Sequence, residues 1–164
     1  RKKYSMEKIT SFTIDHTRLF PGVYVSRKDK VGKETVTTFD LRFTAPNVEP
    51  AMENAAMHAI EHLAATYLRN DSEWKEKILY FGPMGCRTGF YLLIKGDWES
   101  KDIHELLLSC FSFIAEYEGD IPGQTEHDCG NFRDMNLPVA KWWGKKYCDE
   151  VLKKFSFENT HYPA

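Results

Sequence analysis

The chain has 164 residues, of which 42% are hydrophobic and 28% charged, and its formal net charge is -2 at pH 7. This length suits one domain with its own hydrophobic core, and the small charge argues against nucleic-acid binding by bulk electrostatics. The longest apolar run, at residues 90–94, is far shorter than the roughly 20 residues that span a bilayer. No secretory signal is visible, so we expect a cytoplasmic protein that binds neither nucleic acid nor membrane.

The beginning of the chain is basic up to Met6, which would serve as a natural start. We therefore interpret residues 1–5 as an N-terminal extension, of a kind that is usually solvated, and residues 6–164 as a single domain. The first patterned segments are short. Alternation of apolar and polar residues predicts strands at residues 11–15 and 23–26.

The segment at residues 35–44 has the clearest strand pattern in the chain. Successive side chains of a strand point to opposite faces of the sheet. Phe39 and Leu41 therefore share the face that packs on the core. Asp40 and Arg42 share the other face, so Arg42 points either to solvent or to a site.

The rest of the chain mixes helices and strands. A helix is expected at about residues 50–68, where alanine is frequent. Strands follow at residues 77–81 and 90–95, then a helix with Ser100 as its N-cap and, after a long loop, a last helix at about residues 137–155. Because these elements do not alternate regularly, the sequence predicts an α+β domain with a mainly antiparallel sheet packed against helices.

An H-x-x-E-H pattern lies inside the first expected helix, with His58 and His62 at its ends and Glu61 between them. Residues four apart lie one turn above each other on the same face of a helix, so both imidazoles can bind one metal ion. Glu61 is placed to act as a base next to the metal rather than as a ligand. The alternative interpretation is a pair of surface histidines on an amphipathic helix.

A third metal ligand is needed, because catalytic zinc sites usually have three protein ligands and one open position. Long loops in compact domains often carry function. Residues with suitable side chains occur in the long loop at residues 119–134 and on the helix before it: Glu126, His127, Asp128, Cys129 and His104. Spacing does not choose among them. Two imidazoles and one thiolate would suit zinc, iron(II) or cobalt(II).

Cys86 is a second candidate for chemistry, because it lies in the loop at residues 82–89, which holds three glycines. Glycine lets the backbone approach a ligand closely, and the neighbouring Arg87 would favour the thiolate. The alternative is that Cys86 is a small buried apolar residue, which is what we expect of Cys110 and Cys148.

Five short segments, in order along the chain, carry a further signal: Ser11-Phe12-Thr13-Ile14-Asp15-His16; Phe39-Asp40-Leu41-Arg42-Phe43 with Pro46-Asn47; His58-Ala59-Ile60-Glu61-His62; Gly82-Pro83-Met84-Gly85-Cys86-Arg87-Thr88-Gly89; and Cys129-Gly130-Asn131. Together they resemble the S-ribosylhomocysteine lyase family, the LuxS family. The resemblance runs from about residue 11 to the last helix. In two places the chain departs from the family pattern: Asp128 stands where glutamine is frequent, and Tyr80-Phe81 where many members have an acidic residue.

The resemblance implies a role for each candidate at the reaction centre. The metal ligands would be His58, His62 and Cys129. The metal would be iron(II) in the cell, with zinc or cobalt often found in preparations. Glu61 and Cys86 would be the acid/base pair.

The resemblance also implies how substrate is held. Ser11, His16 and Arg42 would line the pocket of a homodimer whose sites lie at the subunit interface, and residues 6–164 would be one catalytic domain. The substrate would be S-ribosylhomocysteine. The implied products are homocysteine and 4,5-dihydroxy-2,3-pentanedione, the precursor of the signal autoinducer-2.

Two other functions are compatible with the metal motif alone. A metallopeptidase would use the glutamate to activate a zinc-bound water, and it would have no need of Cys86. A non-enzymatic metal-binding module would bind metal without turning over any sugar thioether.

Overall fold

Four strands form one antiparallel sheet in the computed structural model, which describes residues 5–164. The strands are ordered β1-β2-β4-β3 in the sheet, and their bounds are Gly22–Val31 for β1, Glu34–Arg42 for β2, Ile78–Pro83 for β3 and Gly89–Lys95 for β4. The expected extension at residues 1–5 lies, apart from Ser5, outside the described residues.

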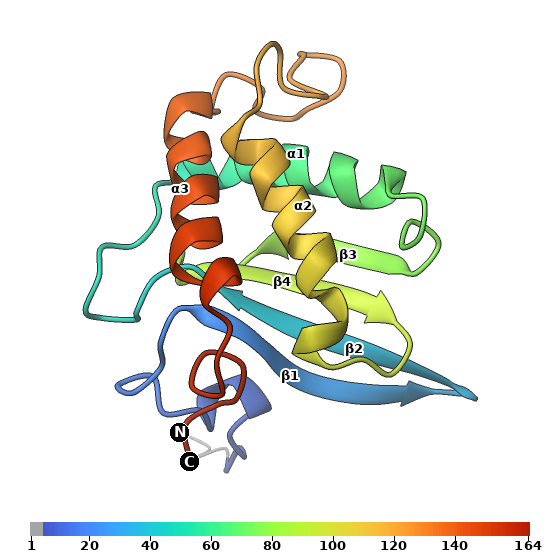
Figure 1. The fold of residues 1–164 in the computed structure, drawn as a ribbon, viewed down its shortest axis with the longest axis vertical. Coiled ribbons are helices and arrows are strands. Elements are labelled where there is room, and N and C mark those ends of the chain that lie inside the picture. Colours follow the sequence, from blue (N-terminus) through green and yellow to red (C-terminus); the bar gives the residue numbers. More distant parts are fainter. Residues whose placement is uncertain (1–4) are drawn as a thin grey trace.

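Three helices pack against this sheet and lie over one of its faces (Figure 1). Their bounds are Asn54–Asn70 for α1, His104–Ala115 for α2 and Leu137–Glu150 for α3, and short 3-10 turns occur at Thr10–Phe12, Ser100–Ile103 and Leu152–Lys154. The predicted single α+β domain is therefore confirmed. Within the described residues, no helix combines the length and the apolar character needed to cross a membrane.

The two faces of β2 differ as the sequence predicts. Phe39 and Leu41 are fully buried in the core beneath the helices. Asp40 pairs across the sheet with Tyr24 of β1 and Tyr91 of β4, so these side chains share the face away from the helices. Asp40 and Arg42 are nevertheless buried on that face, so Arg42 does not face solvent.

The predicted strand at residues 11–15 is wrong, because this segment satisfies its hydrogen bonds locally. It forms a 3-10 turn at Thr10–Phe12. The Thr13 hydroxyl donates to the Thr10 carbonyl at 2.7 Å, and Asp15 Oδ1 accepts from the backbone N–H and the hydroxyl of Thr17. Such local bonds compete with a strand ladder.

Two predicted helix starts are also wrong. Helix α1 begins at Asn54 rather than near residue 50, because the Met52 N–H is held by the Arg87 carbonyl and Glu53 is extended. Ser100 is not an N-cap: its hydroxyl donates to the Val23 carbonyl at 2.8 Å, and Glu99 caps the turn instead.

The segment after α3 runs back to β1, so that it lies at the same end of the molecule as the described segment that precedes β1 (Figure 1). Val23 N–H donates to the Asn159 carbonyl at 2.8 Å. Tyr162 stacks on Tyr24 with ring centroids 4.8 Å apart. The C-terminal segment thus covers part of the sheet face that the helices leave open.

Candidate metal centre

His58 and His62 lie one turn apart on α1, and both are partly buried. Their ring centroids are 4.9 Å apart and their planes are inclined by 76°. The helix therefore brings the two imidazoles together as their spacing predicts.

Backbone carbonyls from the loop at residues 119–134 fix the orientation of both rings. His58 Nδ1 lies 2.9 Å from the Asp134 carbonyl oxygen, and His62 Nδ1 lies 2.7 Å from that of Pro122. A carbonyl only accepts hydrogen bonds, so each Nδ1 carries the proton and each Nε2 keeps a lone pair. Imidazoles that bind metals are usually held in this way.

Cys129 completes the group, with its Sγ 3.4 Å from His58 Nε2. The donor atoms of His58, His62 and Cys129 all lie within 4.8 Å of one another. Nitrogen and sulfur ligands of one tetrahedral zinc ion would lie about 3.6 Å apart at normal bond lengths. The three residues thus form a metal-binding group that is consistent with a divalent ion.

Three of the other candidates for the third ligand, namely His127, Asp128 and His104, have different partners. His127 is 97% exposed and its ring faces Asp128 Oδ1 at 2.7 Å. His104 contacts the Leu152 carbonyl, and its ring lies against that of Phe155 with the planes inclined by 56°. None of the three belongs to the metal-binding group found among the described residues.

Glu61 lines a cavity of about 480 Å³ beside this group. The wall opposite α1 comes from the turn between β3 and β4, and the lining residues are Asn54, Met57, His58, Glu61, Pro83, Met84, Gly85 and Arg87. A carboxylate and an imidazole of the metal group therefore face the same space.

Cys86 lies in the same turn, between Gly85 and Arg87, which both line the cavity. Cys86 is exposed. The alternative of a buried apolar Cys86 is therefore wrong, whereas Cys110 and Cys148 are buried as expected. Burial raises the pKa of the Cys110 thiol, which keeps it protonated and inert.

Among the described residues, no hydrogen bond joins Arg87 to the sulfur of Cys86; Arg87 Nη1 donates to the Met52 carbonyl at 3.1 Å. Instead Cys86 Sγ lies 3.1 Å from the hydroxyl of Thr88, to which Arg42 Nη1 donates at 2.8 Å. Sequence reasoning missed Thr88, since no pattern links residue 88 to residue 42.

Arg42 is held by a buried ion pair with Asp40. Its Nε and Nη2 donate to the two carboxylate oxygens at 3.1 and 2.6 Å, and the side chains are 2% and 1% exposed. Burial alone would lower the pKa of Arg42, but the Asp40 carboxylate outweighs this and the pKa is raised.

Ser11 and His16 are both partly buried in the segment before β1, and His16 Nδ1 contacts the Ile14 carbonyl at 2.8 Å. In Figure 1 this segment lies at the bottom and the loop after α2 at the top. Neither residue lines the cavity next to Glu61, so a single chain does not bring them to the metal-binding group.

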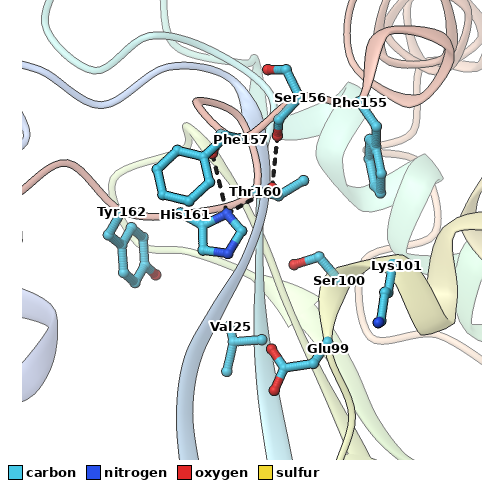
Figure 2. A pocket seen from close by; sticks show the side chains of 10 residues that line it. All are labelled: Val25, Glu99, Ser100, Lys101, Phe155, Ser156, Phe157, Thr160, His161 and Tyr162. Carbon is cyan, nitrogen blue, oxygen red and sulfur yellow. Dashed lines mark hydrogen bonds between the residues drawn. The ribbon is translucent and has the colours of Figure 1, made fainter.

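A larger cavity, of about 850 Å³, lies elsewhere. Figure 2 shows it between Val25 of β1, the turn at Glu99–Lys101 and the C-terminal segment. None of the predicted site residues lines it.

Comparison with known proteins identifies relatives of this chain. The family model described as S-ribosylhomocysteinase (LuxS) matches residues 9–158. The chain is 58% identical to the S-ribosylhomocysteine lyase of Clostridium beijerinckii over 158 residues, which cover 96% of this chain and 99% of that protein. It is 58% identical over 159 residues to the enzyme of Phocaeicola vulgatus (97% and 99% covered) and 55% identical over 158 residues to that of Borreliella burgdorferi strain B31 (96% and 100% covered).

Proposed function

Since the chain belongs to the LuxS family of S-ribosylhomocysteine lyases, we propose that His58, His62 and Cys129 bind its metal ion and that Glu61 and Cys86 transfer its protons. The activity is that of a carbon–sulfur lyase: the thioether of S-ribosylhomocysteine is cleaved to homocysteine and the precursor of autoinducer-2. The observation that carries the residue assignment is the convergence of the three donor atoms within 4.8 Å.

The donor set supports a borderline metal. Two imidazole nitrogens and a thiolate suit iron(II), zinc and cobalt(II), and we propose iron(II) in the cell, with zinc or cobalt(II) in preparations. When bound, such an ion withdraws electrons from a carbonyl or hydroxyl oxygen of the sugar and so acidifies the neighbouring C–H.

The protein residues supply the proton transfers. The sugar carbonyl must move from C1 to C3, which requires a proton to leave one carbon and return to its neighbour twice. Glu61 takes and returns protons through a carboxylate oxygen that faces the cavity, and Cys86 does so through its sulfur, from the turn that forms the opposite wall. Removal of the C4 proton then expels the C5 sulfur as homocysteine thiolate, which is protonated.

Substrate binding is proposed to involve two chains. Ser11 and His16 lie in a segment remote from the metal-binding group, next to the exposed apolar side chains of Ile9 and Phe12. Exposed apolar patches often mark interfaces, which supports a homodimer in which this segment enters the partner's site. Arg42 would contribute from the Cys86 side, since its Nη1 and Nη2 each retain one N–H.

The first test is thiol release from S-ribosylhomocysteine by anaerobically prepared, cobalt-loaded protein. We expect homocysteine release by the parent and a loss of at least about 100-fold in Glu61→Gln and Cys86→Ala variants. Full activity of the Cys86→Ala variant would overturn its role. Turnover of a peptide instead of the thioether would favour the metallopeptidase interpretation.

The two-chain site is tested by mixing inactive variants. His16→Ala and Cys86→Ala chains are refolded together in equal amounts. If His16 acts on the partner's Cys86, half of the dimers regain one intact site, which gives about a quarter of parental activity. No recovery in a mixture that contains heterodimers would exclude a shared site.

A further inference from the structure

A continuous series of hydrogen bonds joins Cys86 to the C-terminal segment. Cys86 Sγ contacts Thr88 Oγ1 at 3.1 Å, and Arg42 Nη1 donates to Thr88 Oγ1 at 2.8 Å. Arg42 binds both oxygens of Asp40, and the Tyr162 hydroxyl donates to Asp40 Oδ2 at 2.7 Å. Below, we call these five residues the Cys86–Tyr162 network.

The donors and acceptors of this network favour one orientation of the Thr88 hydroxyl. Arg42 has only N–H donors, so Thr88 Oγ1 must accept from it. The single hydrogen of the Thr88 hydroxyl is then free to be donated to Cys86 Sγ, which lies 3.1 Å from Oγ1. A thiolate accepts this hydrogen in a charge-assisted bond, whereas the sulfur of a neutral thiol is only a weak acceptor. The network therefore favours the deprotonated sulfur.

The network is rigid because its middle is buried. Thr88 is 7% exposed, and Asp40 and Arg42 are almost fully enclosed. Its charges are one carboxylate and one guanidinium, which compensate each other. The Arg42 guanidinium orients the Thr88 hydroxyl, and this hydroxyl donates to the exposed sulfur of Cys86. The buried surroundings of Arg42 and Thr88 strengthen these hydrogen bonds.

Tyr162 closes the far end of the network. It lies in the C-terminal segment beside Phe157 and His161 (Figure 2), and its ring stacks on Tyr24. Burial, and then the Asp40 carboxylate, raise the pKa of Tyr162, so its hydroxyl remains a donor at any working pH. This donor holds Asp40 Oδ2 in the position from which it binds Arg42 Nη2.

We propose that Thr88, Asp40 and Tyr162 are positioning residues for Cys86, which hold its sulfur in place and in the thiolate form through Arg42. The role of Cys86 in proton transfer rests on the proposed function, but its reactivity as a thiolate can be measured without turnover. Through Tyr162, the C-terminal segment therefore helps to position Cys86 without contacting it.

The direct test uses Thr88→Val, which removes the hydroxyl and keeps the shape, and Thr88→Ser, which keeps the hydroxyl. The alkylation rate of Cys86 by iodoacetamide is followed by mass spectrometry of its peptide in cobalt-loaded protein. At pH 7 we expect Thr88→Val to react about 10-fold more slowly than the parent, and Thr88→Ser to react nearly as fast. At pH 10 the three proteins should react alike.

The pH dependence of alkylation distinguishes the loss of the Thr88 hydroxyl from a general loosening of the fold. A loosened fold would expose Cys86 at every pH and also expose Cys110 and Cys148, whose alkylation serves as an internal control. Equal rates for Thr88→Val and the parent at pH 7 would overturn the proposal. So would slow reaction of Thr88→Val at both pH values.

The contribution of Tyr162 is tested with a matched pair of variants. Tyr162→Phe removes the hydroxyl bonded to Asp40, whereas Tyr24→Phe removes a neighbouring hydroxyl that donates to the Phe20 carbonyl. We expect alkylation of Cys86 at pH 7 to slow about 2- to 3-fold in Tyr162→Phe, and to be unchanged in Tyr24→Phe. Equal effects of the two variants would exclude a specific role of Tyr162.

Failure of the proposed function remains distinguishable from failure of this proposal. If the parent protein released no homocysteine but showed the alkylation pattern above, the result would support the network and contradict the assignment of the lyase residues. If the parent is an active lyase and its Thr88→Val variant is alkylated and turns over substrate at the parental rates, the result would support the residue assignment and contradict the network.

Discussion

The metal-binding group and the Asp40–Arg42 pair are both polar constellations, but the fold holds them in opposite ways. His58, His62 and Cys129 are partly exposed, and backbone carbonyls of one loop orient the imidazoles. Asp40 and Arg42 are buried behind the sheet, where side chains from other elements close around them. The first group should therefore depend on its ligands and loop, and the second should contribute to global stability.

The largest effect is expected from removing a metal ligand. In Cys129→Ala the group loses its only sulfur, so we expect metal affinity and lyase activity to fall by more than about 100-fold, since even the residues that orient metal ligands are worth 10- to 100-fold. Equilibrium dialysis with cobalt(II) measures the affinity. The free energy of unfolding of the metal-free protein should hardly change. A large change in this free energy would contradict the proposed difference between the metal-binding group and the Asp40–Arg42 pair.

The Asp40→Ala variant should show the opposite behaviour. It leaves the Arg42 guanidinium buried without its carboxylate, which costs about 3–5 kcal/mol in similar cases. Chemical denaturation of the metal-free protein measures this loss. The control is Asp29→Ala, which removes a surface ion pair with Arg27 at 2.7 Å and should cost less than about 1 kcal/mol. Similar losses in the two variants would refute the distinction.

A smaller effect is expected from the loop that orients the metal ligands. Gly123 has φ +73°, and an added Cβ would lie 3.1 Å from His62 Nδ1. Gly123→Ala should therefore disturb the contact with Pro122 and weaken cobalt(II) binding about 10-fold. Gly119→Ala is the matched control, because Gly119 also has positive φ, +100°, but no atom lies within 4 Å of its Cβ position. Both variants carry backbone strain, but only Gly123→Ala should bind cobalt(II) more weakly than the parent.

The smallest effect is expected at the histidine beside the third ligand. His127 is 97% exposed and faces Asp128, so His127→Ala should bind cobalt(II) as tightly as the parent. Isothermal titration of the metal-free proteins would detect a difference. A clear loss of affinity would mean that His127 reaches the metal, and the ligand set would have to be revised.

The two constellations also differ in how far sequence could predict them. His58 and His62 were recognisable because a helix fixes the relation between residues four apart. Cys129 was one of five candidates from the residues alone, since it lies 71 positions from His58, and only the family resemblance selected it. No local rule determines where a loop of this length returns to the helix.

For the buried pair, strand alternation predicted that Asp40 and Arg42 share a face, but not that the C-terminal segment would cover it. The same limit explains the error at Ser100, whereas the error at residues 11–15 has a local cause. In both places polar side chains found partners that the pattern does not encode: the Val23 carbonyl for Ser100, and Thr17 for Asp15. Local periodicity predicts elements and faces, whereas contacts between distant segments require the folded chain.

The loop at residues 119–134 has a consequence for metal exchange. It supplies the Cys129 ligand and the carbonyls of Pro122 and Asp134 that hold the two imidazoles. Because one segment holds all three ligands, loss of an ion is opposed by every one of these contacts, so we expect dissociation to be slow even for a metal of moderate affinity. The ion recovered with the purified protein would then record which metal was present when the loop closed, rather than which one binds most tightly.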